Sequence, residues 1–240
     1  MSTPYDLNTV DYLNKYMPAF KIGSGECNNY PLIKFIAKEG KPIILSTGMN
    51  TIESISKAVK IFREFKVPYA LLHCTNVYPT SPELVRLGAI EELQNNFSDA
   101  IIGLSDHTVY NYPSMGAIAM GASIIERHFT DSMDRDGPDI SCSMDINDCK
   151  ELIKGSDVLF RERGGKKNII KEEKVTSNFA FATVVTINNI KKGQRLNLNN
   201  IWVKRPGTGQ IKASEFHKIL GKRVNKDIKI DTHLKLKDII

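Results

Sequence analysis

The sequence predicts an α/β protein with a longer amino-terminal part built on a parallel sheet and a small β-rich carboxyl-terminal part. Three observations lead to this prediction. Apolar runs typical of buried strands alternate with amphipathic helical stretches, at about 25–30 residues per unit, which is the βαβ pattern. From Phe179 onward the pattern changes to short strands with turns. A basic, glycine-containing stretch at residues 163–167 separates the two patterns.

The expected elements follow one another in a regular order. A helix over residues 6–16 comes first, and strands are expected at residues 19–23, 42–47, 69–74, 100–105 and 122–128. Residues 52–65 are expected to form a helix because apolar residues recur every three to four positions, with Thr51 as N-cap. Gly40 ends one helix before the strand that follows Pro42. The last helix of this part is expected over residues 145–163.

The strands end in polar residues, which in a (β/α)8 barrel gather at the face that carries catalytic groups. Such a barrel needs eight strands to close, and residues 1–4 resemble the tail of a further strand that precedes the first expected helix. We therefore expect residues 1–163 to form a TIM-type (β/α)8 barrel that lacks its first strands. Residues 164–178 are expected to be a linker, and residues 179–240 a separate domain.

The carboxyl-terminal domain contains an internal repeat. Residues 190–201 match residues 228–239, with isoleucine, lysine and leucine positions aligned at a constant offset of 38 residues. Two copies of one β-turn-β unit predict a small pseudo-symmetric domain. A domain this small is expected to pack on a partner surface.

Composition narrows the class of protein. The net charge of +6 suits an anionic ligand such as a phosphorylated metabolite. Nucleic acid is not expected, because the lysines and arginines are scattered and no aromatic-rich basic run appears. The four cysteines lack CxxC spacing, which favours reduced thiols. No apolar run approaches the roughly 20 residues that a membrane span needs, and the start does not resemble a signal peptide. We expect a cytoplasmic protein without membrane partners.

Two histidines carry the strongest chemical signal. The segments GLSDHT, from Gly103, and IIERHFT, from Ile124, are apolar runs that end in polar clusters containing His107 and His128. Imidazoles at the carboxyl ends of successive strands favour a metal site or an acid/base site. Without paired cysteines, an ion of intermediate hardness such as Mn²⁺ fits better than a thiolate zinc site. The alternative is that each histidine is a hydrogen-bonded structural residue.

Further polar residues near the strand ends suit an anion. Phosphate or carboxylate oxygens fit the groups of Lys21, Ser24, Ser46, Asn76 and Ser105. Taken singly, each also fits an ordinary strand-end residue. Arg127 should point to the opposite side of its strand and serve structure. Residues 134–139 are either part of the site or a solvated loop. Arg205, before Pro206, is either presented to an anion or carbonyl group or part of a basic surface turn.

Several motifs stand in one order along the chain. They are KIGSGECNNYPL from Lys21, KPIILSTGMN from Lys41, YALLHCTNVYPT from Tyr69, IIGLSDHT from Ile101, IERHFTD from Ile125, DGPDISCSMD from Asp136 and WVKRPGTG from Trp202. Together they resemble a bacterial N-acetylneuraminate (sialic acid) synthase over essentially the whole chain. The carboxyl-terminal part is similar to that family's antifreeze-like SAF domain, in agreement with the repeat.

The resemblance implies a reaction and a set of site residues. The family condenses phosphoenolpyruvate with N-acetylmannosamine, gives N-acetylneuraminate and phosphate, and uses a divalent metal, usually Mn²⁺. Carried over by motif, His107 and His128 are the metal ligands, and Asp139 is the catalytic residue near the sugar and the metal-bound water. Phosphoenolpyruvate would be held by Lys21, Ser24, Ser46, Asn76, Tyr78 and Ser105, with Glu26 assisting binding.

The resemblance also implies a domain-swapped homodimer, in which Arg205 of the partner subunit's SAF domain reaches the N-acetyl group of the sugar. It further implies a glutamate on a first strand as acid/base, and no residue of this chain can take that role. Two alternatives remain open. One is a synthase for another nonulosonate, such as legionaminic or pseudaminic acid. The other is a non-catalytic remnant that binds a ligand or a partner through its SAF domain.

Overall fold

The computed structural model describes residues 1–240 and divides them into two compact units, Met1–Gly165 and Lys166–Ile240. No helix in it has both the length and the apolar character needed to cross a membrane.

The first unit is built on a five-stranded parallel sheet. Its strands are β1 (Phe20–Ile22), β2 (Ile43–Ser46), β3 (Tyr69–Cys74), β4 (Ile101–Asp106) and β5 (Ile124–Arg127), paired in that order. Each strand pairs only with its neighbours in sequence, so the sheet advances in one direction, as in part of a barrel. The five expected strands are confirmed in number and order, with bounds that differ by at most two residues.

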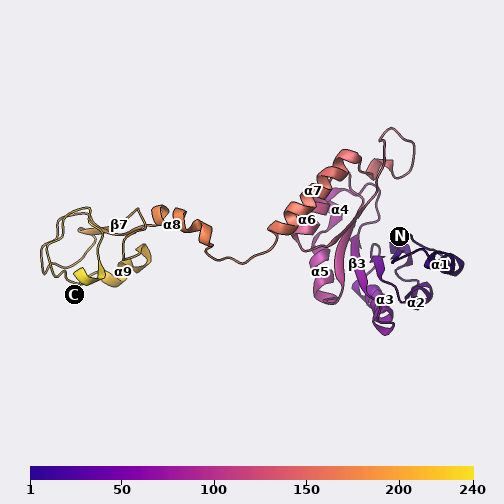
Figure 1. The fold of residues 1–240 in the computed structure, drawn as a ribbon, viewed down its shortest axis with the longest axis horizontal. Helices are drawn as coiled ribbons and strands as arrows, with labels where there is room; N and C mark the ends of the chain where they lie inside the picture. Colours follow the sequence, from indigo (N-terminus) through magenta and orange to yellow (C-terminus); the bar gives the residue numbers. More distant parts are fainter. The chain divides into compact units, whose positions relative to one another are not determined.

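Seven helices belong to this unit: α1 (Leu7–Asn14), α2 (Tyr30–Ala37), α3 (Ile52–Glu64), α4 (Pro82–Val85), α5 (Gly88–Asn96), α6 (Tyr112–Ala119) and α7 (Ile146–Glu162). Figure 1 shows α5, α6 and α7 on the same side of the strands. Side chains at the predicted helix starts accept backbone hydrogen bonds, as Asp6, Thr51 and Asp145 do. Thr51 is therefore confirmed as the N-cap of α3. Gly40, with φ of 70°, follows the end of α2.

The strands separate an apolar face from a polar one. Ile43, Leu45 and Leu71 alternate onto the face that packs against the helices in one buried core. The residues between them face the other way, and near the carboxyl ends these are polar. In register across three adjacent strands, Cys74 pairs with Ser105 and Ser105 with Glu126. The period-two alternation thus collects polar groups on the face away from the helices.

The second unit contains α8 (Lys174–Ala180), β6 (Thr183–Thr186), β7 (Ile201–Lys204) and α9 (Phe216–Ile219), with β6 and β7 antiparallel. Its own core is apolar and includes Val184, Leu196, Val224 and Leu234. Between the first unit and β6, residues 171–173 form a 3₁₀ turn that leads into α8.

The internal repeat is confirmed as a pseudo-twofold arrangement. Ile190 and Ile228, equivalent residues of the two copies, exchange both backbone hydrogen bonds at 2.8 Å. The pairing of Thr186 with Ile201 recurs 38 residues later as Val224 with Ile239. The equivalent turn residues Gly193 and Asp231 both have positive φ, at 84° and 57°. The sequence repeat is therefore a repeat of backbone geometry.

Candidate active site

A buried polar network connects the two outer strands of the sheet. Lys21 Nζ, on β1, donates to Ser46 Oγ at 2.8 Å and lies 3.4 Å from Glu126 Oε2, on β5. Ser105 Oγ, on β4, donates to Glu126 Oε1 at 3.0 Å. Side chains of the first and last strands can meet only because the sheet curls, as a barrel sheet does. The side chain of Lys21 is 9 % exposed and that of Glu126 is 40 % exposed. The ammonium group of Lys21 is therefore buried, whereas the carboxylate of Glu126 is partly open to solvent.

The turns after β1, β2 and β3 meet around Gly48. The Gly48 backbone N–H donates to Ser24 Oγ at 3.0 Å, and Asn50 Nδ2 donates to the carbonyl oxygens of Ser24 and Gly48. A Cβ at Gly48 would lie 1.7 Å from Asn76 Oδ1, so only glycine allows this approach. Ser24 and Asn76 therefore belong to one polar cluster, which lies beside the Ser46 end of β2.

His107 and His128 lie side by side with Tyr78. The ring centroids of the two histidines are 5.3 Å apart, and that of Tyr78 lies 4.1 Å from His107 and 5.9 Å from His128. His107 Nδ1 is 2.9 Å from the Thr75 carbonyl oxygen. Because a carbonyl can only accept, Nδ1 carries the proton in the neutral ring and Nε2 keeps a free lone pair. Burial lowers the pKa of His107, which favours this neutral form.

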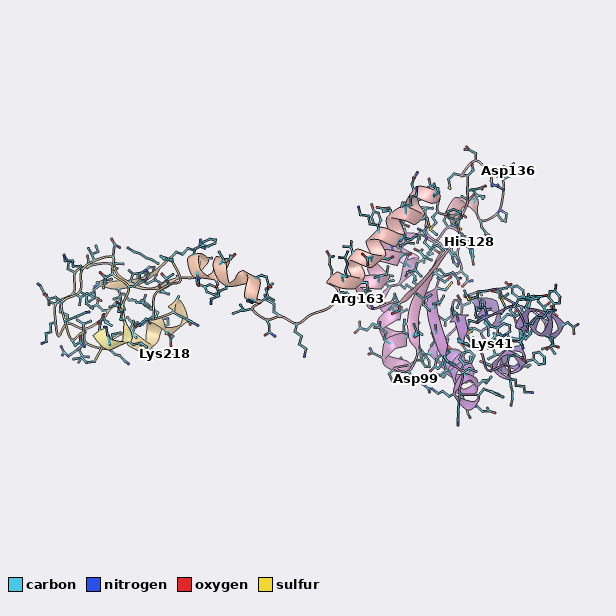
Figure 2. The ribbon with its side chains drawn as sticks, in the orientation of Figure 1. Lys41, Asp99, His128, Asp136, Arg163 and Lys218 are labelled. Carbon is cyan, nitrogen blue, oxygen red and sulfur yellow. The ribbon has the colours of Figure 1, made fainter.

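The loop after β5 brings further donor atoms to His128. Asp139 Oδ2 lies 3.9 Å from His128 Nδ1, and the ligand atoms of His128, Asp139 and Cys142 lie within 4.8 Å of one another. Burial raises the pKa of the Cys142 thiol. In Figure 2, His128 and the loop at Asp136 lie at one end of the sheet and Asp99 lies at the other.

The histidine pair fits a divalent metal. An ion about 2.1 Å from one nitrogen of each ring, at a tetrahedral angle, would place the ring centroids about 5 Å apart, close to the 5.3 Å measured. The hydrogen bond from Nδ1 of His107 to the Thr75 carbonyl oxygen is the kind of contact that orients a histidine whose other ring nitrogen binds a metal. Asp139 adds a carboxylate oxygen near His128, so the donor set combines imidazole and oxygen.

Arg127 has the structural role expected for it. Its side chain is 1 % exposed. It donates to Asn111 Oδ1 at 2.5 Å and to the Thr108 carbonyl oxygen at 2.6 Å, and lies 3.8 Å from Asp106 Oδ2. Asp106 also accepts from the Thr108 backbone N–H and from Ser114 Oγ. This network fixes the turn that carries His107 to α6.

The structure brings together most residues predicted for the site, with two set apart. Lys21, Ser46 and Ser105 share the network above. Glu26 accepts instead from Asn29 Nδ2 at 2.6 Å, near the start of α2. Arg205 is exposed in the second unit, before the cis peptide bond to Pro206, and its role stays a prediction.

Two residues of the site were given no role by the sequence. They are Glu126, one of the polar residues near a strand end, and Cys142, one of the four cysteines without CxxC spacing. For Glu126 the available signal is its spacing of two from His128, which places both on the same face of β5. For Cys142 it is its spacing of three from Asp139.

Comparison with known proteins identifies the family of the chain. The NeuB family matches residues 1–168, and the SAF domain matches residues 181–240. The chain is 37% identical to an N,N'-diacetyllegionaminic acid synthase and 35% identical to a pseudaminic acid synthase, both from Campylobacter jejuni. These matches cover 96% and 99% of this chain and 70% and 69% of the relatives.

A solved structure shows the same fold. The crystal structure of an N-acetylneuraminic acid synthetase from Leptospira borgpetersenii, in complex with citrate, superposes with a TM-score of 0.69 at 31% identity. The match covers 72% of this chain and 61% of that one, so this chain spans less than two thirds of that protein. By these matches, the chain belongs to the NeuB family and carries a SAF domain.

Proposed function

We propose that the chain is a nonulosonate synthase that condenses phosphoenolpyruvate with N-acetylmannosamine, giving N-acetylneuraminate and phosphate. One observation carries the proposal. In a NeuB-family chain, the buried Lys21–Glu126 network lies at the same end of the sheet as the His107–His128 pair. A cation and hydroxyl groups suit an anionic donor substrate, and a histidine pair with a free lone pair suits a divalent metal.

Lys21 is the residue proposed to bind the anionic groups of phosphoenolpyruvate. Its ammonium group lies between Ser46 Oγ and Glu126, and the hydroxyls of Ser46 and Ser105 border it. A phosphate or carboxylate oxygen bound here would accept hydrogen bonds from these groups in place of Glu126. Ser24 and Asn76 extend this surface around Gly48. Charge-assisted hydrogen bonds of this kind position the substrate and stabilise charge that develops at its oxygens.

His107 and His128 would hold the divalent metal, proposed to be Mn²⁺, with Asp139 near it. When bound, such an ion supplies Lewis acidity that polarises the aldehyde oxygen of the open-chain sugar. Asp139 is exposed, and its carboxylate is placed to accept a proton from a sugar hydroxyl or a water beside His128. The ring of Tyr78 packs against that of His107, with centroids 4.1 Å apart, and borders the histidine pair.

The proposal extends to the barrel, the second domain and the assembly of the chain. We place the sheet as five strands of a (β/α)8 barrel, supported by the strand order and by the Lys21 backbone N–H, which donates to the Ser2 carbonyl oxygen beside β1. Arg205 is proposed to reach the sugar of the partner subunit's site in a domain-swapped, cytoplasmic homodimer. Glu26 is proposed to support binding through the start of α2.

A synthase for legionaminic or pseudaminic acid is the second candidate function. It is favoured by the 37% and 35% identity to such synthases. The residues proposed for metal and phosphoenolpyruvate would act in the same way in either case, so the choice between sugars depends on other contacts.

Phosphate release tests the function. The 240-residue chain, alone and mixed with the amino-terminal segment of a relative, is supplied with Mn²⁺, phosphoenolpyruvate and one acylated amino sugar at a time. We expect release with N-acetylmannosamine, and about a 100-fold lower kcat/KM for Lys21→Met, equivalent to about 3 kcal/mol for a lost buried charge contact. Lys60→Met, at an exposed position of α3, is the matched control.

Two outcomes would contradict the proposal. Release only with a sugar of the legionaminic or pseudaminic series would move the chain to the second candidate function. If no phosphate is released with any acylated amino sugar, by the chain alone or by the mixture, the non-catalytic alternative remains.

A further inference from the structure

We propose that Cys142, with His128 and Asp139, forms a binding site for a thiophilic divalent cation such as Zn²⁺ or Cd²⁺. The site needs only these three side chains and is independent of the proposed reaction. Its consequence for activity rests on that reaction, because His128 is shared. A cation held here would take His128 away from the His107–His128 pair.

The turn that carries Cys142 places its thiol next to Asp139. Residues Ile140–Cys142 form a 3₁₀ turn, and the Cys142 backbone N–H donates to the Asp139 carbonyl oxygen at 3.2 Å. Ser143 Oγ donates to the same carbonyl at 2.8 Å. The Cys142 thiol itself donates to the Asp139 carbonyl oxygen at 3.3 Å. The turn therefore keeps the thiol beside Asp139, and a bound cation would replace this weak hydrogen bond.

Backbone hydrogen bonds connect the same turn to the end of β5. The Met144 backbone N–H donates to the His128 carbonyl oxygen at 2.9 Å, and the Thr130 backbone N–H donates to the Met144 carbonyl oxygen at 3.0 Å. These bonds surround the parallel bridge between Phe129 and Met144. Because Cys142 lies two residues before Met144, this backbone pairing holds Cys142 close to His128.

The donor atoms are close to the spacing that a metal requires. Ligand atoms of a tetrahedral Zn²⁺ site lie about 3.4–3.8 Å from one another, given metal distances of about 2.0–2.3 Å. The His128 to Asp139 distance is 3.9 Å, and all three donors lie within 4.8 Å. Side-chain rotation of the exposed Asp139 can close the remaining gap.

The chemistry of the donors selects the kind of cation. A thiolate, an imidazole and a carboxylate favour Zn²⁺ or Cd²⁺ over the harder Mn²⁺. As the bond between Sγ and the metal forms, the thiol proton leaves to solvent, so one proton is released for each cation bound. Cys142 is fully buried whereas Asp139 is exposed, so a cation would enter from the Asp139 side.

The other cysteines do not offer an equivalent site. Cys74 Sγ lies 3.9 Å from His107 Nδ1, but that nitrogen carries the proton donated to Thr75 and has no lone pair for a metal. Cys27 is buried in the apolar core. Cys149 lies on α7, and neither cysteine has a histidine or carboxylate cluster around it.

Titration of the metal-free chain with Cd²⁺ tests the site, because cadmium–thiolate bonds absorb in the ultraviolet by sulfur-to-metal charge transfer. We expect a band that saturates at one cation per chain, remains in Cys74→Ser and Cys149→Ser, and disappears in Cys142→Ser. A band that survives in Cys142→Ser, or cadmium binding without any band, would overturn the proposal. Circular dichroism checks that each variant is folded.

A second measurement uses the unaltered chain. Because Cys142 is buried, its thiol reacts with iodoacetamide only during local opening, so the reaction time is set to label Cys142 measurably in the metal-free chain. Labelling of each cysteine is then mapped by mass spectrometry with and without Cd²⁺. Protection of Cys142 should be about tenfold when Cd²⁺ is at about ten times its Kd, with Cys149 unchanged. Equal labelling of Cys142 in both samples would also overturn the proposal. Neither measurement involves phosphoenolpyruvate, so failure here leaves the proposed function to its own assay.

Discussion

At the scale of the residue, the burial of an ion pair decides whether its charges can act on a ligand, and burial differs between the two ends of the sheet. Lys21 is buried at the carboxyl end, where Glu126 is its neighbouring anion and substrate can compete for it. Arg63 and Asp99, at the amino end, form a surface pair with side chains 52% and 47% exposed. Both pairs join distant elements. Only the first is desolvated enough for its charge to act strongly on a ligand.

The Arg63–Asp99 pair gives a prediction about acid stability. Arg63 Nη2 donates to Asp99 Oδ1 at 2.6 Å and, chiefly through this hydrogen bonding, lowers the pKa of Asp99 to about 2. A lowered folded-state pKa adds stability that is present above the unfolded pKa of about 3.9 and is lost as the pH falls through the folded pKa. Asp99→Asn should therefore lower the free energy of unfolding at pH 7, by about 0.5 kcal/mol for a half-exposed pair.

Urea unfolding followed by circular dichroism measures this difference. We expect the gap between the native chain and Asp99→Asn to shrink as the pH falls from about 5 toward 2. Asp134→Asn, in an exposed loop, is the control and should leave the free energy of unfolding unchanged. A gap that stays constant across this range would show that the charge of Asp99 is not its source.

At the scale of the element, the repeat of the second unit depends on its two turns. Gly193 and Asp231 occupy equivalent places with positive φ. A Cβ at Gly193 would meet nothing within 4 Å, so the cost of Gly193→Ala is conformational rather than steric. We expect about 1 kcal/mol lower free energy of unfolding for Gly193→Ala, measured by urea unfolding monitored at Trp202.

The equivalent turn provides the comparison. Asp231→Asn should cost less than Gly193→Ala, because asparagine tolerates the left-handed region and the ion pair with Lys204 that it removes is exposed and weak. The opposite order of the two variants would contradict the view that backbone conformation limits both turns.

The elements themselves were largely predictable from local sequence. Apolar runs between polar ends gave all five strands, and Thr51 gave the start of α3, because burial and capping are decided by neighbouring residues. Bounds differ by one or two residues at the strand ends, as at Ala122 and Ser123 before β5.

The site was predictable only where its residues share a strand end. His107 and His128 could be paired because adjacent parallel strands end together. The contact of Lys21 with Glu126 depends on the curl of the whole sheet, which no local pattern records. Cys142 was missed for a similar reason, since its place beside His128 comes from the bridge between Phe129 and Met144.

At the scale of the whole molecule, the proposed exchange of SAF domains makes a quantitative prediction. If Arg205 completes the site of the partner subunit, a subunit with Lys21→Met and a subunit with Arg205→Met complement one another. Their heterodimer has one site with both defects and one site with neither. Random pairing of equal amounts makes half of the dimers heterodimers, so about a quarter of all sites are intact.

Co-expression of the two variants, in the form of the chain that releases phosphate, measures this complementation. We expect about a quarter of the unaltered activity in the mixed sample and almost none in either variant alone. If each Arg205 instead serves the site of its own subunit, every site in every dimer carries a defect and mixing restores nothing. Sedimentation of the mixed sample as a dimer is required in both cases. Recovery of about a quarter of the activity would therefore show that Arg205 acts in the site of the partner subunit, whereas no recovery would show that it acts in its own.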